Sequence, residues 1–221
     1  MEPIKLSSFG YRSQKITMSF LKANTVSLIY PIPFVILYMA IVLLVESSRM
    51  AESLATGQVA AQTAGGFGMN NLLIEFLLYM VLLFVLIILH ELTHALIFLR
   101  GCENGWKSIK FGIKSLTPYC HCKEAVTVSV ARQSCLGPLW AVALPLGVIA
   151  LITGSFLLYL LTIVMIFGSG ADLWIVFKLR RFNGKTCYAL DMENEIGMTV
   201  FVPDENAGIS TADTPGTEAD A

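Results

Sequence analysis

The sequence predicts an all-α membrane protein: four transmembrane helices with small cytoplasmic β-hairpin elements. Of its 221 residues, 55% are hydrophobic and only 14% are charged, and the mean hydropathy is +0.68. Soluble domains usually carry about 25% charged residues. The net charge of −1 provides no basic field for phosphates, so we expect no nucleic-acid partner. Five cysteines without regular spacing argue against a disulfide framework.

Each predicted helix rests on an apolar stretch close to the length of about 20 residues that crosses a bilayer. The first runs from Val26 to Val45, and the second from Leu72 to Leu89, with its apolar pattern continuing to Leu99. The third and fourth share residues 133–171, which contain no Asp, Glu, Lys or Arg. The turn at 153–155 divides them into a short span from Leu136 and a longer one running towards Phe177. A single re-entrant hairpin is the alternative for this last region.

The basic residues predict the orientation of these spans. Lys and Arg are frequent before the first span, between residues 100 and 132, and after the last span, whereas the loop 46–71 contains only Arg49. Four spans place all three basic segments on one side, which the bias of Lys and Arg towards cytoplasmic loops assigns to the cytoplasm. We therefore expect a multi-pass protein of the cell membrane, in contact with the lipid bilayer, with both termini cytoplasmic.

The parts outside the membrane are expected to be small. Residues 1–24 form a cytoplasmic N-terminal segment, 25–203 the four-span domain, and 204–221 a disordered acidic tail. Residues 47–70 are small and polar, which predicts a flexible external loop. Runs of β-favouring residues around turn signals predict one hairpin within 106–130 and a second within 186–202.

The cytoplasmic end of the second span carries the motif His90-Glu91-Leu92-Thr93-His94. Helix positions i and i+4 share one face, so both imidazoles can bind one metal ion. Glu91 projects about 100° round the helix from His90, where its carboxylate can act as a general base on a water in the open coordination position. An ionisable side chain inside an apolar helix costs about 2–4 kcal/mol, which favours a functional role. The alternative is that these residues only lie among the lipid headgroups.

A catalytic zinc ion generally has three protein ligands. Asp172 is the only acidic residue of the last span, and it reaches the depth of the two histidines because both helices run towards the cytoplasm. Glu103 and Glu124 on the intervening loop are rival third ligands. Asp172 would otherwise be an interfacial carboxylate paired with Arg180 or Lys178.

Taken together, these motifs resemble the three-helix core of site-2-type intramembrane metalloproteases and, more closely, a bacterial zincin peptidase family, over roughly residues 15–203. The resemblance implies that His90, His94 and Asp172 bind Zn²⁺ and that Glu91 is the catalytic base. The motifs that carry it are His90-Glu91-x-x-His94, Gly137-Pro138, Lys22-Ala23-Asn24, Pro118-Tyr119-Cys120-His121-Cys122, Gly170-Ala171-Asp172-Leu173-Trp174 and the region 191–202.

The function that follows is that of an integral-membrane zinc metalloprotease. It would hydrolyse peptide bonds at or near the cytoplasmic membrane face, in a membrane-embedded or membrane-proximal protein substrate. The alternative is a non-catalytic zinc-binding or regulatory membrane protein that keeps the fold. Cys120 and Cys122 are expected to be reduced thiols, with a second metal site as the alternative.

Overall fold

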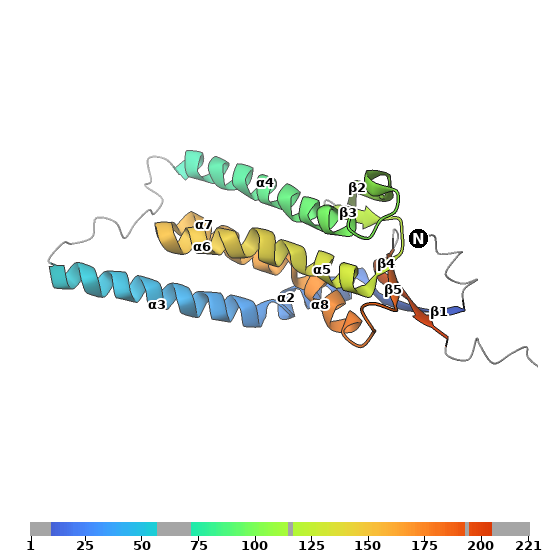
Figure 1. Ribbon diagram of the computed structural model, residues 1–221. Coiled ribbons are helices and arrows are strands. Elements are labelled where there is room, and N and C mark those ends of the chain that lie inside the picture. Colours follow the sequence, from blue (N-terminus) through green and yellow to red (C-terminus); the bar gives the residue numbers. More distant parts are fainter. Residues whose placement is uncertain (1–9, 57–71, 115–116, 193–194, 205–221) are drawn as a thin grey trace, which may run out of the picture.

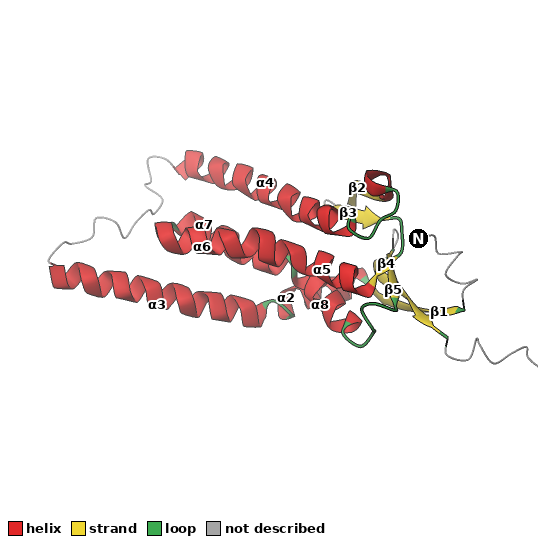
Figure 2. Cartoon of the chain, viewed as in Figure 1, coloured by secondary structure: helices red, strands yellow, loops and turns green. Residues whose placement is uncertain are grey.

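The computed structural model describes residues 10–56, 72–114, 117–192 and 195–204. Long helices lie side by side, and the strands gather at one end of the bundle (Figures 1 and 2). The described helices include four that are long and apolar enough to cross a membrane, at Lys22–Thr56, Leu72–Phe98, Val128–Thr153 and Phe156–Leu179. The prediction of a mainly helical fold with four such helices and small β elements is confirmed.

The elements follow one another as helices interrupted by short strands. The helices are α2 (Phe20–Ile29), α3 (Ile32–Thr56), α4 (Leu72–Phe98), the 3₁₀ turn η2 (Gly105–Ser108), α5 (Val128–Pro138), the π-helical turn η3 (Leu139–Ala143), α6 (Leu144–Thr153), α7 (Phe156–Gly168) and α8 (Gly170–Leu179). The strands are β1 (Tyr11–Met18), β2 (Ile109–Lys114), β3 (Thr117–Cys122), β4 (Val126–Thr127), β5 (Tyr188–Asp191) and β6 (Ile196–Pro203).

The first long apolar segment is divided into α2 and α3 at Pro31. Ser19 caps the start of α2 by accepting a hydrogen bond from the Lys22 N–H at 3.4 Å. Pro31 has no N–H, so it cannot donate the helical hydrogen bond to the carbonyl of Ser27, and the regular helix is interrupted there. Beyond the break, α3 continues to Thr56, so residues 47–56 are helical rather than part of the predicted loop. The rest of that loop lies outside the described residues.

The third long helix starts eight residues earlier than hydropathy predicts, at Val128 instead of Leu136. The side chain of Thr127 accepts a hydrogen bond from the Val130 N–H and caps the helix. Arg132 donates from Nη2 to backbone carbonyls at the end of and just beyond α8, those of Leu179 and Phe182. These contacts stabilise the polar first turns of α5, which an apolar pattern cannot reveal.

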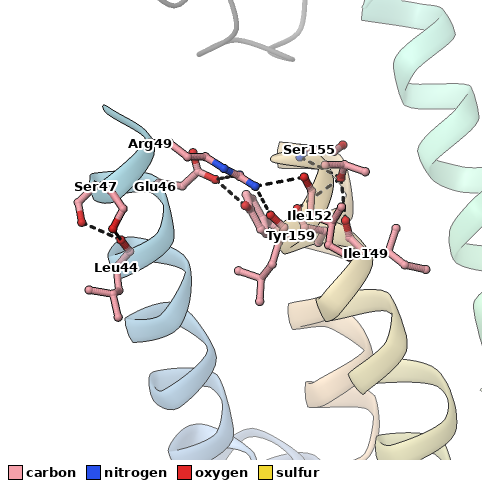
Figure 3. Close-up of polar contacts among 12 residues, drawn as sticks. Leu44, Glu46, Ser47, Arg49, Ile149, Ile152, Ser155 and Tyr159 are labelled. Carbon is pink, nitrogen blue, oxygen red and sulfur yellow. Dashed lines mark hydrogen bonds and ion pairs between the residues drawn. The ribbon is translucent and has the colours of Figure 1, made fainter. Parts of the chain in front are cut away.

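A polar clasp joins α3 to the α6–α7 turn at the end of the bundle opposite the strands (Figure 3). Arg49 donates to Glu46 and to the backbone carbonyls of Leu151 and Ile152. Glu46 also accepts a hydrogen bond from the Tyr159 hydroxyl at 2.6 Å. Because Arg49 satisfies carbonyls that the end of α6 leaves open, it holds the two segments together.

Replacing Arg49 with Ala is therefore expected to destabilise the bundle. The Arg49 and Glu46 side chains are 39% and 40% exposed, so we expect a loss of about 1 kcal/mol rather than the larger cost of a buried pair. Thermal unfolding of the detergent-solubilised protein measures this loss. Arg49→Lys is the matched control, since it keeps the charge but not the forked geometry, and an unchanged midpoint in Arg49→Ala would contradict the clasp.

Two antiparallel sheets close the other end of the bundle. β2 pairs with β3, and a four-stranded sheet has the order β1-β6-β5-β4. The two predicted hairpins are therefore present. β1 was not predicted: it lies in the N-terminal segment and pairs with β6 from Tyr11 opposite Pro203 to Met18 opposite Ile196. The predicted acidic tail lies outside the described residues except for Asp204.

Candidate metal centre

Two histidines of α4 and an aspartate of α8 meet near the strand end of the bundle. His90 Nε2 and His94 Nε2 each lie 3.5 Å from the same oxygen, Oδ2 of Asp172. The three side chains are only 10–16% exposed. The structure thus brings together the three residues that the sequence singled out, from segments almost 80 residues apart in the chain.

The donor set and its dimensions fit a zinc ion. One ligand atom from each residue lies within 4.8 Å of the other two, and within the described part of the chain this is the one such group of three His, Cys, Asp or Glu residues. Ligand atoms held about 2.0–2.1 Å from a tetrahedral zinc ion are about 3.4 Å apart, close to the two measured separations. Two imidazoles and a carboxylate are also ligands that catalytic zinc commonly has.

Helix α5 fixes the orientation of His94. The Nδ1 atom of His94 lies 2.9 Å from the backbone carbonyl oxygen of Ser134, and the Ser134 hydroxyl donates to the His94 carbonyl at 3.1 Å. A proton on Nδ1 that is shared with a carbonyl leaves the Nε2 lone pair free for a metal. Ser134 was not predicted from the sequence, although a small hydroxyl residue in an apolar helix is a common helix–helix contact.

Two glycines allow the helices that carry the ligands to approach their neighbours. A Cβ on Gly137 of α5 would lie 2.5 Å from Ile97 Cδ1 and 2.8 Å from Thr93 Cγ2, both on α4. A Cβ on Gly170, at the start of α8, would overlap the backbone carbonyl of Ser27 in α2. Since Asp172 follows Gly170 by two residues, this close contact with α2 sets the position of the carboxylate.

Glu91 faces a cavity of about 740 Å³ that lies between the helix ends and the sheets. His90, His94 and Asp172 line the same cavity. Strand β3 packs against α4, and Cys120 of that strand lines the same cavity. None of the described residues that line the cavity is Lys or Arg, a setting that favours a cation.

The basic residues near Asp172 interact with aromatic rings. The Nζ atom of Lys178 lies 5.5 Å from the centroid of Trp174, and the guanidinium of Arg180 lies 3.8 Å from the centroid of Phe177. Within the described part of the chain, the ion-pair partners of Asp172 are the two histidines. The alternative of an interfacial pair between Asp172 and these basic residues is not what the structure shows.

The rival third ligand Glu124 has other partners. It is 7% exposed and accepts hydrogen bonds from the Glu103 N–H at 2.9 Å, from the Asn104 N–H and side-chain amide at 3.1 and 2.9 Å, and from the Ser108 hydroxyl. Burial by itself raises the pKa of Glu124, but these hydrogen bonds outweigh burial and lower it to about 2. The carboxylate thus organises the loop after α4.

This depressed pKa predicts an acid-sensitive loop. The ordinary pKa of a glutamate is 4.5. Because the pKa of Glu124 is lower in the folded state, its carboxylate stabilises the fold at pH values above 4.5. That contribution is lost as the pH falls towards about 2. Unfolding of the solubilised protein between pH 6 and about 2.5 measures the loss. The Glu124→Gln variant is expected to show a shallower pH dependence, and identical profiles for both proteins would contradict the assignment.

Among the described residues, the cysteines near β3 belong to no group of three possible metal ligands. The Sγ atoms of Cys102 and Cys122 are 3.3 Å apart, and all five cysteines are free. Burial raises the pKa of Cys120 to about 12 and raises that of Cys122 further. That Cys120 and Cys122 are reduced thiols stays a prediction from the sequence.

Residues 83–187 match the model of a family described as "Putative zincin peptidase". The matched segment contains the whole candidate metal centre, from His90 on α4 to Asp172 on α8, together with Glu91 and β3. The match suggests a metallopeptidase, and zincins are zinc enzymes, which fits the possible metal-binding group of His90, His94 and Asp172. No curated protein and no solved structure matches the chain.

Proposed function

We propose that the protein is an integral-membrane zinc metalloprotease that hydrolyses peptide bonds at or near the cytoplasmic membrane face. The observation that carries the proposal is the convergence of His90, His94 and Asp172 beside Glu91 at the wall of one cavity. The zincin peptidase match over the same segment supports it.

Each residue of the site has a distinct task in this reaction. His90, His94 and Asp172 would hold Zn²⁺, which supplies Lewis acidity towards water and the scissile carbonyl. Glu91 takes the proton of the attacking water and returns it to the nitrogen of the departing peptide.

The distribution of charge supports an orientation with the strands in the cytoplasm. In the described part of the chain, Lys and Arg residues lie in or beside the strands and at the adjoining helix ends, whereas Arg49 lies at the opposite end. An excess of Lys and Arg marks the cytoplasmic side of a membrane protein. The cavity would then lie at the inner membrane surface, where membrane-embedded or membrane-proximal protein segments reach it.

A reconstitution experiment tests the proposal. The protein is placed in phosphatidylethanolamine–phosphatidylglycerol vesicles together with a mixture of single-span membrane proteins, and new peptide termini are identified by mass spectrometry. We expect termini that appear with zinc, disappear after treatment with a chelator and return when zinc is added back. Stoichiometric zinc binding without new termini would instead support the non-catalytic, zinc-binding alternative.

A further inference from the structure

A second histidine–carboxylate pair faces the same cavity but does not belong to the candidate metal group. His121 of β3 and Asp191 of β5 come from different sheets and are 70 residues apart in the chain. Their Nδ1 and Oδ2 atoms are 3.0 Å apart. His121 is 7% exposed and the Asp191 side chain 20% exposed, and both residues line the cavity.

The contact between Nδ1 and Asp191 leaves Nε2 of His121 as the ring nitrogen that can bind a molecule in the cavity. Among the described residues, Asp191 is the hydrogen-bond partner of the ring, and it contacts Nδ1. When the imidazole is protonated, with the carboxylate as its counter-ion, both ring nitrogens carry a proton and Nε2–H is the remaining donor. A donor held in this way is already oriented when charge develops nearby.

The strand that carries His121 packs against the helix that carries the proposed base. Glu91, Cys120 and His121 all line the same cavity. The His121–Asp191 pair therefore shares this cavity with the proposed reaction centre.

We propose that His121 is a further catalytic residue and that Asp191 is the positioning residue that orients it. This proposal rests on the peptide hydrolysis proposed above. The Nε2–H of His121 would donate a hydrogen bond to the carbonyl oxygen of the scissile amide, which is the oxygen that becomes negatively charged. The site would thereby distinguish the transition state from the planar substrate.

The step balances without a further reactant. The oxygen of water forms a bond to the carbonyl carbon, and the carbonyl π pair moves onto its own oxygen. The pair then returns to form the new carbonyl as the C–N bond breaks. Glu91 carries the proton from water to the departing nitrogen. His121 stabilises the charged oxygen by a hydrogen bond and keeps its own protons throughout.

Two small probes distinguish this role from a structural one. N-phosphoryl-leucine amide, a phosphoramidate, presents tetrahedral anionic oxygens like those of the transition state, whereas acetohydroxamate needs only the metal. We expect His121→Phe to bind the phosphoramidate about 100-fold more weakly, in line with the loss of one oxyanion donor. The same variant should keep its zinc and should bind acetohydroxamate within about threefold of the wild type.

Three further variants complete the design. His121→Gln keeps an N–H donor and is expected to retain part of the phosphoramidate affinity, and it replaces His121→Phe should that variant fail to fold. Asp191→Asn should weaken phosphoramidate binding selectively, though by less than His121→Phe. The control is Tyr188→Phe in β5, whose ring packs against Tyr11 and which is not among the residues that line the cavity, so it should bind both probes as the wild type does.

The possible results separate this proposal from the proposed function. Phosphoramidate affinity that is equal in wild type and His121→Phe overturns the role of His121 alone. So does an equal loss of both probes in a variant that retains zinc, because this would indicate general distortion of the cavity. A wild-type protein that holds no zinc overturns the hydrolase and, with it, the role of His121.

Discussion

Glu91→Gln is expected to abolish peptide hydrolysis while leaving about one zinc ion per chain bound. Glutamine has nearly the same shape as glutamate but cannot accept the proton of water at neutral pH, so the variant loses the general base and keeps the donor set. A positioned general base accelerates the reaction by a factor of about 10²–10⁴. We therefore expect kcat to fall by at least about 100-fold. The measurement is the rate at which new termini form in the reconstituted mixture, with metal content determined on the same preparation.

A second carboxylate on the same helix supplies the matched control. Glu75 lies in the first turn of α4, at the far end from the strands, and Glu75→Gln should hydrolyse peptides at the wild-type rate. Wild-type turnover in Glu91→Gln would rule out Glu91 as the base. Loss of zinc from Glu91→Gln would show that this residue acts on the metal rather than on water.

Replacing either His94 or Asp172 with Ala is expected to remove zinc from the purified protein. Each change leaves two protein ligands, and structural and catalytic zinc sites in proteins use at least three. We expect the metal content to fall from about one equivalent to a small fraction of that value, and hydrolysis to fall with it. Elemental analysis after dialysis against a weak chelator measures the metal directly.

Glu124 provides the control for this experiment because it was the rival third ligand. Its hydrogen bonds to the loop after α4 predict that Glu124→Gln retains zinc. Zinc retained in Asp172→Ala but lost in Glu124→Gln would reverse the assignment. A folding defect is distinguished from ligand loss by size-exclusion chromatography in detergent, in which a folded variant elutes as the wild type does.

The sequence was sufficient to predict the features that depend on local pattern. The four apolar stretches follow from hydropathy, and the shared face of His90 and His94 follows from the period of a helix. Asp172 could be assigned to the same depth because two helices that run in the same direction bring equivalent positions to one level. The structure brings these three side chains together.

Contacts between distant segments could not be predicted in this way. Helix α5 begins at a capped, polar turn where Arg132 reaches the end of α8, and no apolar pattern marks that start. Gly170 packs on the backbone of Ser27, a contact that depends on how two helices cross. The proximity of His121 and Asp191 likewise requires the two sheets to be in place. Such contacts are set by tertiary packing, which a single sequence does not encode in any local period.

The pairing of β1 with β6 determines when the cavity can be completed during synthesis. Met18 of β1 and Met198 of β6 both line the cavity, and their strands join residues separated by some 180 positions. Contacts so remote along the chain cannot form before residue 203 has been synthesised, and we expect them to form late in folding. Until β6 pairs with β1, a nascent chain therefore lacks one wall of the cavity.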